Sequence, residues 1–419
     1  MNGFNFTATL LLFLCRLGPY RGMHVGMFEY TSLKQVLFDQ TMEQALTALL
    51  QNDALVRGSP ARIFVLMAAT LNSRAGLRRR LEVALGSQLA GSCDAVAAHT
   101  PRKDVLAALQ MARDVNAEVI VTIGGGSVID AGKVIQFCLN ADIRDEETLL
   151  RYARFSDGSS GDLSGTRPET RLKKPVYQIA VPTTLSAAEF SNNAGVTDTA
   201  NSTKEGYRFD GLCARYVIYD PFLVQYTPDW LWLSTAVRSI DHAIEGYCSV
   251  DVFPYLQGHF LHAVRLLRES LPAMYKSPAD AGIRSLNQQA VWLAGCGLGR
   301  VRHGASHGIG YVLGAQCGVP HGHTSCVMLP AVLRWNFMTN GTIQRTIGAG
   351  INADGQLLDE WIVDWLKEME LPVRLRDIGV TREQLPGVAL AAAGNSVVRS
   401  NPRPIRSADD VMEILELAW

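Results

Sequence analysis

The sequence lacks the features that mark several large classes of protein. It has no Cys-x-x-Cys pair, and its eight cysteines are scattered between Cys15 and Cys326. This spacing fits neither a disulfide framework nor a cysteine zinc site, so we expect reduced thiols and a cytoplasmic protein. Basic residues (39) and acidic residues (40) nearly balance, and no long basic run occurs. The balance argues against nucleic acid as a partner.

Long apolar runs are also scarce. Residues 7–17 read TATLLLFLCRL, which is about the length of the apolar part of a signal peptide. The run lacks a basic stretch before it and a clear small-residue cleavage site after it, and it is too short to span a bilayer. We therefore predict an N-terminal extension over residues 1–25 and no membrane partner.

The overall composition is typical of a soluble globular protein. The 419 residues are 47% hydrophobic and 19% charged, and the length favours two domains. Short apolar runs that begin at Arg62 or span 118–123, 176–181 and 216–219 predict buried strands. Helical patterns at 73–85 and 104–116 lie between them. This alternation predicts a mostly parallel α/β domain over residues 26–221.

After Pro221 the pattern becomes helical. Apolar residues recur at helical spacing in 232–249, 255–275, 286–298, 326–337 and 357–369. We therefore predict an all-helical domain over residues 222–419. The segment 155–174 is polar and rich in Gly and Ser, which predicts a surface loop.

A glycine loop follows the second predicted strand. Gly124, Gly125, Gly126 and Ser127 end that strand and open a predicted helix, with Asp130 in its first turns. Glycines let the backbone approach a pyrophosphate, and a helix N-terminus offers free N–H groups. The pattern is not Gly-x-Gly-x-x-Gly, so a simple tight turn is the alternative for this loop alone.

A second polar segment, 182–189, follows the third predicted strand. Its hydroxyl side chains, Thr183, Thr184 and Ser186, are suited to bond a phosphate or a ribose. The alternative is a proline-initiated turn that the threonines cap.

Several histidines lie on predicted helices. His303, His307 and Tyr311 are four residues apart, so they share one face of a helix. His242 lies on another helix, with Arg238 four residues before it, and His321 follows after a short loop. Imidazoles from separate elements suit Fe²⁺ or Zn²⁺. The alternative is that they are ordinary core or pocket histidines, which is our interpretation of His99, His259 and His262.

These blocks together resemble the iron-containing alcohol dehydrogenase family of the dehydroquinate synthase-like fold, and their pattern is closest to the maleylacetate reductases. The matching pieces cover roughly residues 26–419 and occur in family order: GGGSVIDAGK, the Pro-Thr-Thr segment ending at Glu189, Lys204 ahead of VIYDP, DHAIEGYCS, HGASHGIGYVLGAQCGVPHG and Asn401-Pro402-Arg403-Pro404.

The resemblance implies a Rossmann-like N-terminal domain, a helical C-terminal domain and an active site in the cleft between them. It implies that NAD(H) or NADP(H) binds along Gly124–Ser127 and Thr183–Thr184, with Lys204 nearby. The family's metal-binding histidines match His242, His307 and His321.

Two positions depart from the metal-dependent members. Arg238 stands where the family has a metal-binding aspartate, and a guanidinium has no lone pair to give a metal. Tyr311 stands where those members carry a histidine. Asp241 is next to His242 but about 100° away from it on a helix, so it is a poor substitute for the aspartate.

Maleylacetate reductases also lack that aspartate, and their Pro-Thr-Thr segment has the same length. We therefore predict an NAD(P)H-dependent reductase that acts on a carbonyl, enol or keto-acid substrate without requiring a metal. His242, His307 or Tyr311 would polarise the oxygen or deliver the proton. Arg238 would anchor a carboxylate, because its planar fork suits one.

Three other interpretations stay open. The first is a metal-dependent dehydrogenase of the same family, and the second is a non-redox lyase, isomerase or cyclase that uses the histidines as acid–base groups. The third is a protein that binds a nucleotide without catalysis. The substrate and the choice between NAD and NADP are not readable from the sequence, and a homodimer is expected.

Overall fold

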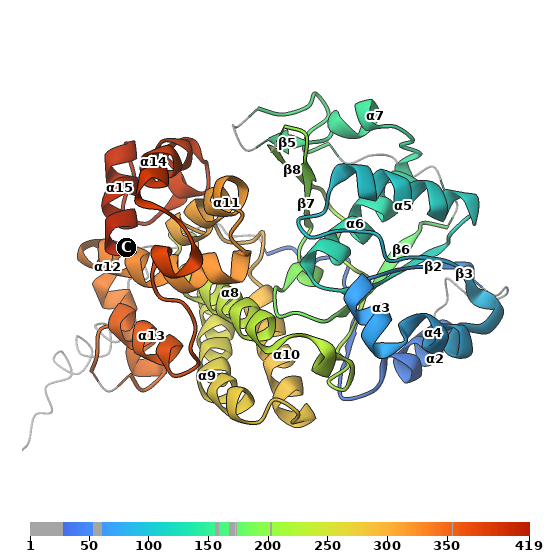
Figure 1. Cartoon of the computed structure of the whole chain (residues 1–419), viewed down its shortest axis with the longest axis horizontal. Coiled ribbons are helices and arrows are strands. Elements are labelled where there is room, and N and C mark those ends of the chain that lie inside the picture. The colour runs from blue at the N-terminus through green and yellow to red at the C-terminus, as the bar shows by residue number, and fades with distance from the viewer. Residues whose placement is uncertain are drawn as a thin grey trace, which may run out of the picture.

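The computed structural model describes residues 28–52, 61–155, 159–166, 172, 174–201, 203–353 and 355–419. The predicted extension, 1–25, and part of the predicted loop, 155–174, lie outside these residues. A sheet covered by helices forms one side of the molecule and a group of longer helices forms the other (Figure 1). The predicted class, an α/β domain with a helical C-terminal part, is confirmed.

The main sheet has six parallel strands in the order β1-β9-β6-β4-β2-β3. The four predicted strands are its four inner ones, and their residues are buried because helices cover both faces. The two edge strands were not predicted. The strands are β1 (Gln35–Leu37), β2 (Ile63–Met67), β3 (Leu89–Cys93), β4 (Val119–Gly124), β6 (Tyr177–Pro182) and β9 (Tyr216–Ile218).

A second, antiparallel sheet has the order β5-β8-β7, and the sequence did not predict it. Its strands are β5 (Arg154–Phe155), β7 (Asn193–Asp198) and β8 (Thr203–Arg208). In β7 every second residue is buried, so the strand is half polar and carries no continuous apolar run. The register pairs Thr197 with Lys204, and Lys204 Nζ lies 3.5 Å from the carbonyl oxygen of His99.

Helices α2 to α7 surround the main sheet. The predicted helix 73–85 is in fact two helices, because Gly76 adopts a left-handed φ of 60° that ends α3. Bounds are α2 (Met42–Asn52), α3 (Ala69–Ala75), α4 (Leu77–Leu85), α5 (Arg102–Asp114), α6 (Gly126–Ala141) and α7 (Glu146–Leu150).

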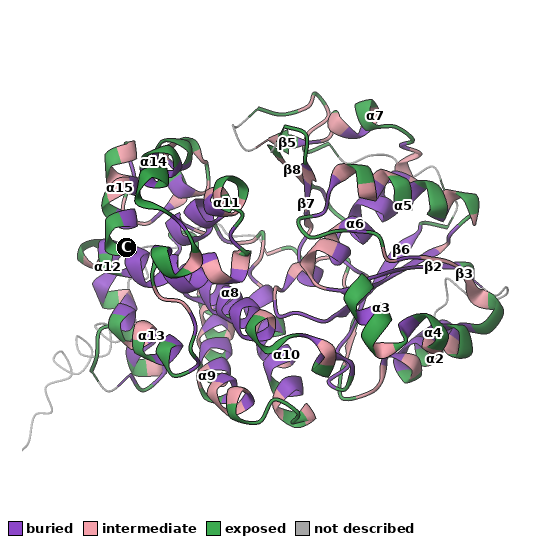
Figure 2. Cartoon of the chain, viewed as in Figure 1, coloured by how far each residue is buried: buried purple, intermediate pink, exposed green. Residues whose placement is uncertain are grey.

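The C-terminal part is helical, as predicted. Its central helix is α8, where 16 of 20 residues are buried, so the polar residues of α8 must find partners inside the protein (Figure 2). None of the described helices has the length and hydropathy needed to cross a membrane. Bounds are α8 (Asp229–Cys248), α9 (Pro254–Lys276), α10 (Ala281–Gly295), α11 (Ala305–Cys317), α12 (His321–Gly350), α13 (Leu358–Lys367), α14 (Leu385–Gly394) and α15 (Ala408–Leu417).

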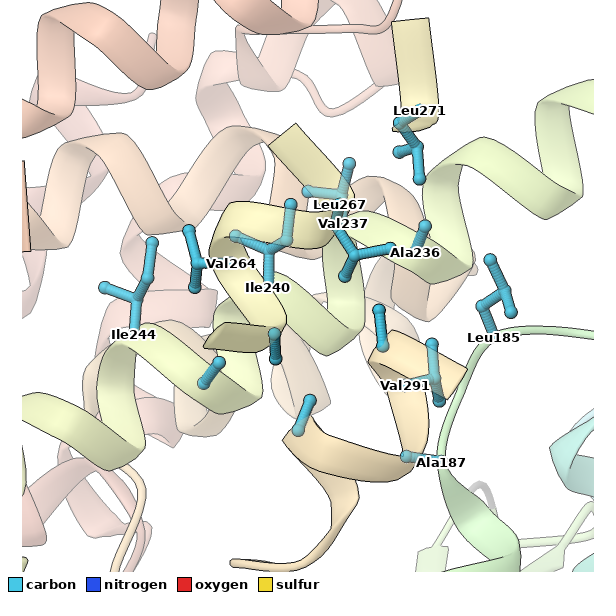
Figure 3. Packing of buried hydrophobic residues seen from close by; sticks show 14 of the residues in the cluster. Leu185, Ala187, Ala236, Val237, Ile240, Ile244, Val264, Leu267, Leu271 and Val291 are labelled. Atoms are coloured by element: carbon cyan, nitrogen blue, oxygen red, sulfur yellow. The ribbon is translucent and has the colours of Figure 1, made fainter. Parts of the chain in front are cut away.

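The loop after β6 joins the sheet to α8. The Leu185 N–H donates to Thr235 Oγ1 over 3.0 Å, and Ser239 Oγ donates to the Leu185 carbonyl over 2.6 Å. Leu185 and Ala187 also belong to the hydrophobic core that α8 and α10 share (Figure 3). This core continues into β9, so the predicted domain boundary near Pro221 stays a prediction.

Candidate functional site

The glycine loop lies at the carboxyl edge of the main sheet. The chain reverses its direction of travel across the sheet between β3 and β4, which places β2 and β4 at a topological switch point. In open α/β sheets ligands bind outside the carboxyl ends of the strands at such a point. No described side chain caps the N-terminus of α6, so its first backbone N–H groups are available to a pyrophosphate.

The loop after β6 lies against the glycine loop. A Cβ atom at Gly125 would stand 2.9 Å from Thr184 Cγ2, and one at Gly126 would stand 3.2 Å from Ser186 Oγ. The Thr183 N–H donates to the Gly124 carbonyl over 3.0 Å. The structure thus brings together the two segments that the sequence proposed as one cofactor site, and a Cβ atom at Gly125 would not fit without movement of Thr184 or of the loops.

Two other predicted cofactor residues have structural contacts of their own. Asp130 accepts a 2.9 Å hydrogen bond from the Gly195 N–H, so it ties α6 to β7. Lys204 Nζ donates to Thr197 Oγ1 over 3.3 Å, and burial lowers the pKa of Lys204. The Lys204 amino group therefore has few protein partners, namely Thr197 and the His99 carbonyl, whereas the Asp130 carboxylate is already engaged.

From the sequence, His99 was interpreted as an ordinary core or pocket histidine. Its backbone N–H donates to Ser127 Oγ over 3.0 Å, and its ring lies 5.8 Å from that of His321, edge to face. His99 and the next residue, Thr100, both have left-handed φ angles, of 65° and 56°. Such strain persists where the surroundings hold it, and it is frequent at functional sites. His99 thus connects the glycine loop with the histidines of the helical part.

We define the histidine cluster as His242, His303, His307 and His321. The ring centroids of His242 and His307 are 4.7 Å apart, and those of His303 and His307 are 4.4 Å apart. His303 precedes α11, so the predicted helical face begins only after it. The His321 ring, at the start of α12, lies 6.0 Å from the ring of Tyr311.

Glu245 orients His307, and the sequence did not single it out as a site residue. His307 Nδ1 lies 2.7 Å from Glu245 Oε2, and both side chains are buried. Glu245 also accepts the N–H groups of Gly304 and Ser306, each over 2.9 Å, so it fixes the N-terminus of α11. His307 Nε2 is buried without a hydrogen-bond partner in the described chain. The carboxylate therefore holds the ring so that Nε2 is left for a ligand.

Charges around His307 favour its protonated form. Burial and the charge of Arg238 lower the pKa of His307, but Asp241 and Glu245 outweigh them and raise it above its ordinary value. His242 behaves in the opposite way, because burial and the neighbouring His307 and Arg238 lower its pKa well below the ordinary value. His307 therefore takes up a proton more readily than His242 does.

Arg238 lies between the helices of the cluster. It donates to Ser325 Oγ over 3.0 Å, pairs with Asp241 Oδ2 at 3.5 Å and stands 5.4 Å from the centroid of the Tyr311 ring. Asp241 also approaches His307 Nδ1 to 3.5 Å. Asp241 thus faces Arg238 and His307, and the prediction that it is a poor substitute for a metal-binding aspartate stays a prediction.

The residues do not fit a metal ion as they stand. The group of His, Cys, Asp and Glu donor atoms found within 4.8 Å of one another in the described residues is Asp241, Glu245 and His307, not the three family histidines. The carboxylate oxygens of Asp241 and Glu245 already accept hydrogen bonds from a serine hydroxyl and from backbone N–H groups, and the Nδ1 atom of His307 is hydrogen-bonded to Glu245. Arg238 adds a fixed positive charge, which repels a cation. The ligand set His242, His307 and His321 stays a prediction.

A buried carboxyl group behind the cofactor loops gives a test of stability. Tyr219 Oη donates to Glu189 Oε1 over 3.0 Å, and burial raises the pKa of Glu189 to about 7. The folded protein therefore binds this proton more tightly than the unfolded chain does. Protonated Glu189 therefore contributes to the free energy of unfolding at pH values below the pKa that this carboxyl group has in the unfolded chain. The contribution is lost as the pH rises towards 7.

We expect Glu189→Gln to remove this loss. Between pH 5 and pH 8 the wild-type protein should lose on the order of 2 kcal/mol of unfolding free energy relative to the variant. Denaturant unfolding at both pH values measures this difference. If the difference in unfolding free energy between the two proteins is the same at pH 5 and at pH 8, Glu189 is ionised in the folded as well as in the unfolded protein.

Comparisons with known proteins agree with this geometry. Residues 40–221 match the description "Iron-containing alcohol dehydrogenase", and residues 232–419 match "Fe-containing alcohol dehydrogenase family, C-terminal". Dehydrogenase ALT3 of Alternaria alternata is 30% identical over 81% of this chain and 94% of its own length. A lactaldehyde reductase of Escherichia coli is 28% identical over 72% of this chain and 77% of its own length. A maleylacetate reductase of a Pseudomonas species is 26% identical over 81% of this chain and 85% of its own length.

Solved structures show the same fold. A maleylacetate reductase from Agrobacterium tumefaciens superposes with a TM-score of 0.77 at 23% identity, covering 95% of this chain and 99% of that one. The chain belongs to the iron-containing alcohol dehydrogenase family, and it is an oxidoreductase.

Proposed function

We propose that the chain is an NAD(P)H-dependent reductase of small carbonyl compounds that carry an acidic group, of keto-acid type, with a reverse reaction that oxidises the alcohol. The observation that carries this proposal is the Glu245–His307 pair, which leaves the buried Nε2 atom without a protein partner. The names of two relatives, lactaldehyde reductase and maleylacetate reductase, support a carbonyl substrate. No observation favours the lyase, isomerase or cyclase interpretation.

His307 is the proton donor in this proposal. When bound, the reduced nicotinamide supplies a hydride to the carbonyl carbon. Charge then develops on the carbonyl oxygen, and a protonated His307 Nε2 is the group that stabilises it and transfers the proton. Glu245 keeps the ring in place and compensates its positive charge, so it acts as a positioning residue.

The glycine loop, the Thr184–Ser186 segment and Lys204 form the proposed cofactor site. The first measurement is a fluorescence titration of the purified protein with NADH and with NADPH. Saturable binding of either coenzyme supports the site and identifies the preferred one. If neither binds, both the cofactor site and the reductase proposal are wrong.

Arg238 is the proposed anchor for the acidic group of the substrate. We expect Arg238→Met to raise KM for a keto acid by about 30-fold, because a charge-assisted bidentate contact contributes roughly 2 kcal/mol. Steady-state kinetics should compare the acid with its neutral methyl ester, whose KM should change less than about threefold. An equal loss for the two substrates would mean that Arg238 does not recognise the acidic group.

We also propose a cytoplasmic homodimer. The seven cysteines within the described residues are free thiols, which is typical of a reducing compartment. Sedimentation equilibrium at micromolar concentration distinguishes a dimer from a monomer, and a mass of one chain would exclude the dimer.

A further inference from the structure

Arg238 is a buried cation, so neighbouring groups must compensate its positive charge. It is 6% exposed, and its Nη1 atom contacts Ser325 of α12 at 3.0 Å and Asp241 of its own helix at 3.5 Å. The ring of Tyr311 on α11 covers the guanidinium. Its contacts therefore come from three helices, so the cation is a fixed part of the fold.

Three histidines of the cluster each have an imidazole nitrogen without a partner. His242 Nδ1, His307 Nε2 and His321 Nδ1 are buried and have no hydrogen-bond partner in the described part of the chain. Buried nitrogen atoms without partners are rare, and here three come from three different helices. Three imidazoles are a common ligand set for a divalent transition metal, provided that a further oxygen or nitrogen donor completes it.

Asp241 accounts for the stability of Arg238 at this place. Its Oδ2 atom accepts hydrogen bonds from Ser306 Oγ at 2.9 Å and from Ser325 Oγ at 2.6 Å, and it faces the guanidinium. Removing one partner of a buried ion pair is unfavourable, so Arg238 and Asp241 depend on each other. The carboxylate is thus a counter-ion to arginine and not a free metal ligand.

We propose that the Arg238–Asp241 pair takes the place of a divalent metal ion, and that Arg238→Asp alone turns the histidine cluster into a metal site. The substitution removes the positive charge and shortens the side chain that lies between the helices of the histidine cluster. It also supplies a carboxylate one helical turn before His242, on the same face of α8. This inference goes beyond the proposed reductase activity, because metal binding is measured without turnover.

The test compares Co²⁺ binding to the wild-type protein, Arg238→Asp and Arg238→Asn. Calorimetry gives the stoichiometry and affinity, and the visible absorption of bound Co²⁺ reports its coordination. We expect one Co²⁺ per chain in Arg238→Asp, bound at least about 100-fold more tightly than by the wild-type protein or by Arg238→Asn. Adding His307→Ala to Arg238→Asp should abolish the tight binding and the absorption.

A second variant covers the possibility that two neighbouring carboxylates prevent folding. Arg238→Asp/Asp241→Asn removes one charge and keeps an acceptor for Ser306 and Ser325. Circular dichroism and thermal unfolding show which variants are folded. The proposal is overturned if the wild-type protein binds one Co²⁺ as tightly as the folded carboxylate variants, or if those variants bind no better than Arg238→Asn.

Discussion

Replacing His307 with asparagine is expected to lower kcat on the order of a thousandfold, which is within the range that general acid catalysis contributes. Asparagine keeps a polar side chain but provides no group that can be protonated near neutral pH. Binding of the nicotinamide cofactor should change less than about threefold, because the glycine loop is formed by different elements. Stopped-flow and steady-state kinetics with a saturating keto acid measure the effect.

The other candidate donors provide the controls. Tyr311→Phe removes only a hydroxyl from a side chain that is 42% exposed, so we expect a loss of less than about tenfold in kcat. Glu245→Gln should lower kcat by about 10- to 100-fold with KM unchanged, as for a group that orients another. If Tyr311→Phe loses a thousandfold and His307→Asn does not, the tyrosine and not the histidine donates the proton.

The inner strands of the sheet were predictable because burial on both faces leaves a continuous apolar run. The edge strand β3, with the sequence LAGSC, is short and half exposed, so its pattern is not distinct from that of a loop. The antiparallel strands β7 and β8 alternate polar and buried residues and pair with each other. Their existence depends on a partner strand that local periodicity does not reveal.

Those parts of the site that depend on residues close together in the sequence could be predicted. The spacing of His307 and Tyr311 and the sequence around Gly125 place these residues on a helix face and in a turn. The contacts of Glu245 and Arg238 depend on how helices cross: His307 is 62 residues from Glu245, and Ser325 is 87 residues from Arg238. No periodicity within one helix contains that information, so these contacts required the structure.

The glycine at position 125 gives the second large expected effect. A Cβ atom there would lie 2.9 Å from Thr184 Cγ2, a distance that real Cβ atoms essentially never show, so for a residue as large as valine we expect the two loops to separate. Because the separation moves the α6 N-terminus away from Ser186, we expect Gly125→Val to weaken NAD(P)H binding at least about a hundredfold. Fluorescence titration measures the dissociation constant.

Two comparisons identify the cause of that loss. Gly387 lies in helix α14 with open space where its Cβ would be, so Gly387→Ala should leave the dissociation constant within about twofold and can even stabilise the helix. Thr184→Ser deletes the methyl group that Gly125→Ala would meet. If steric contact between the loops is the reason for the glycine, the double variant Gly125→Ala/Thr184→Ser binds the cofactor about tenfold more tightly than Gly125→Ala. If the double variant binds no better, the glycine is required for another reason, such as direct contact of the pyrophosphate with the backbone.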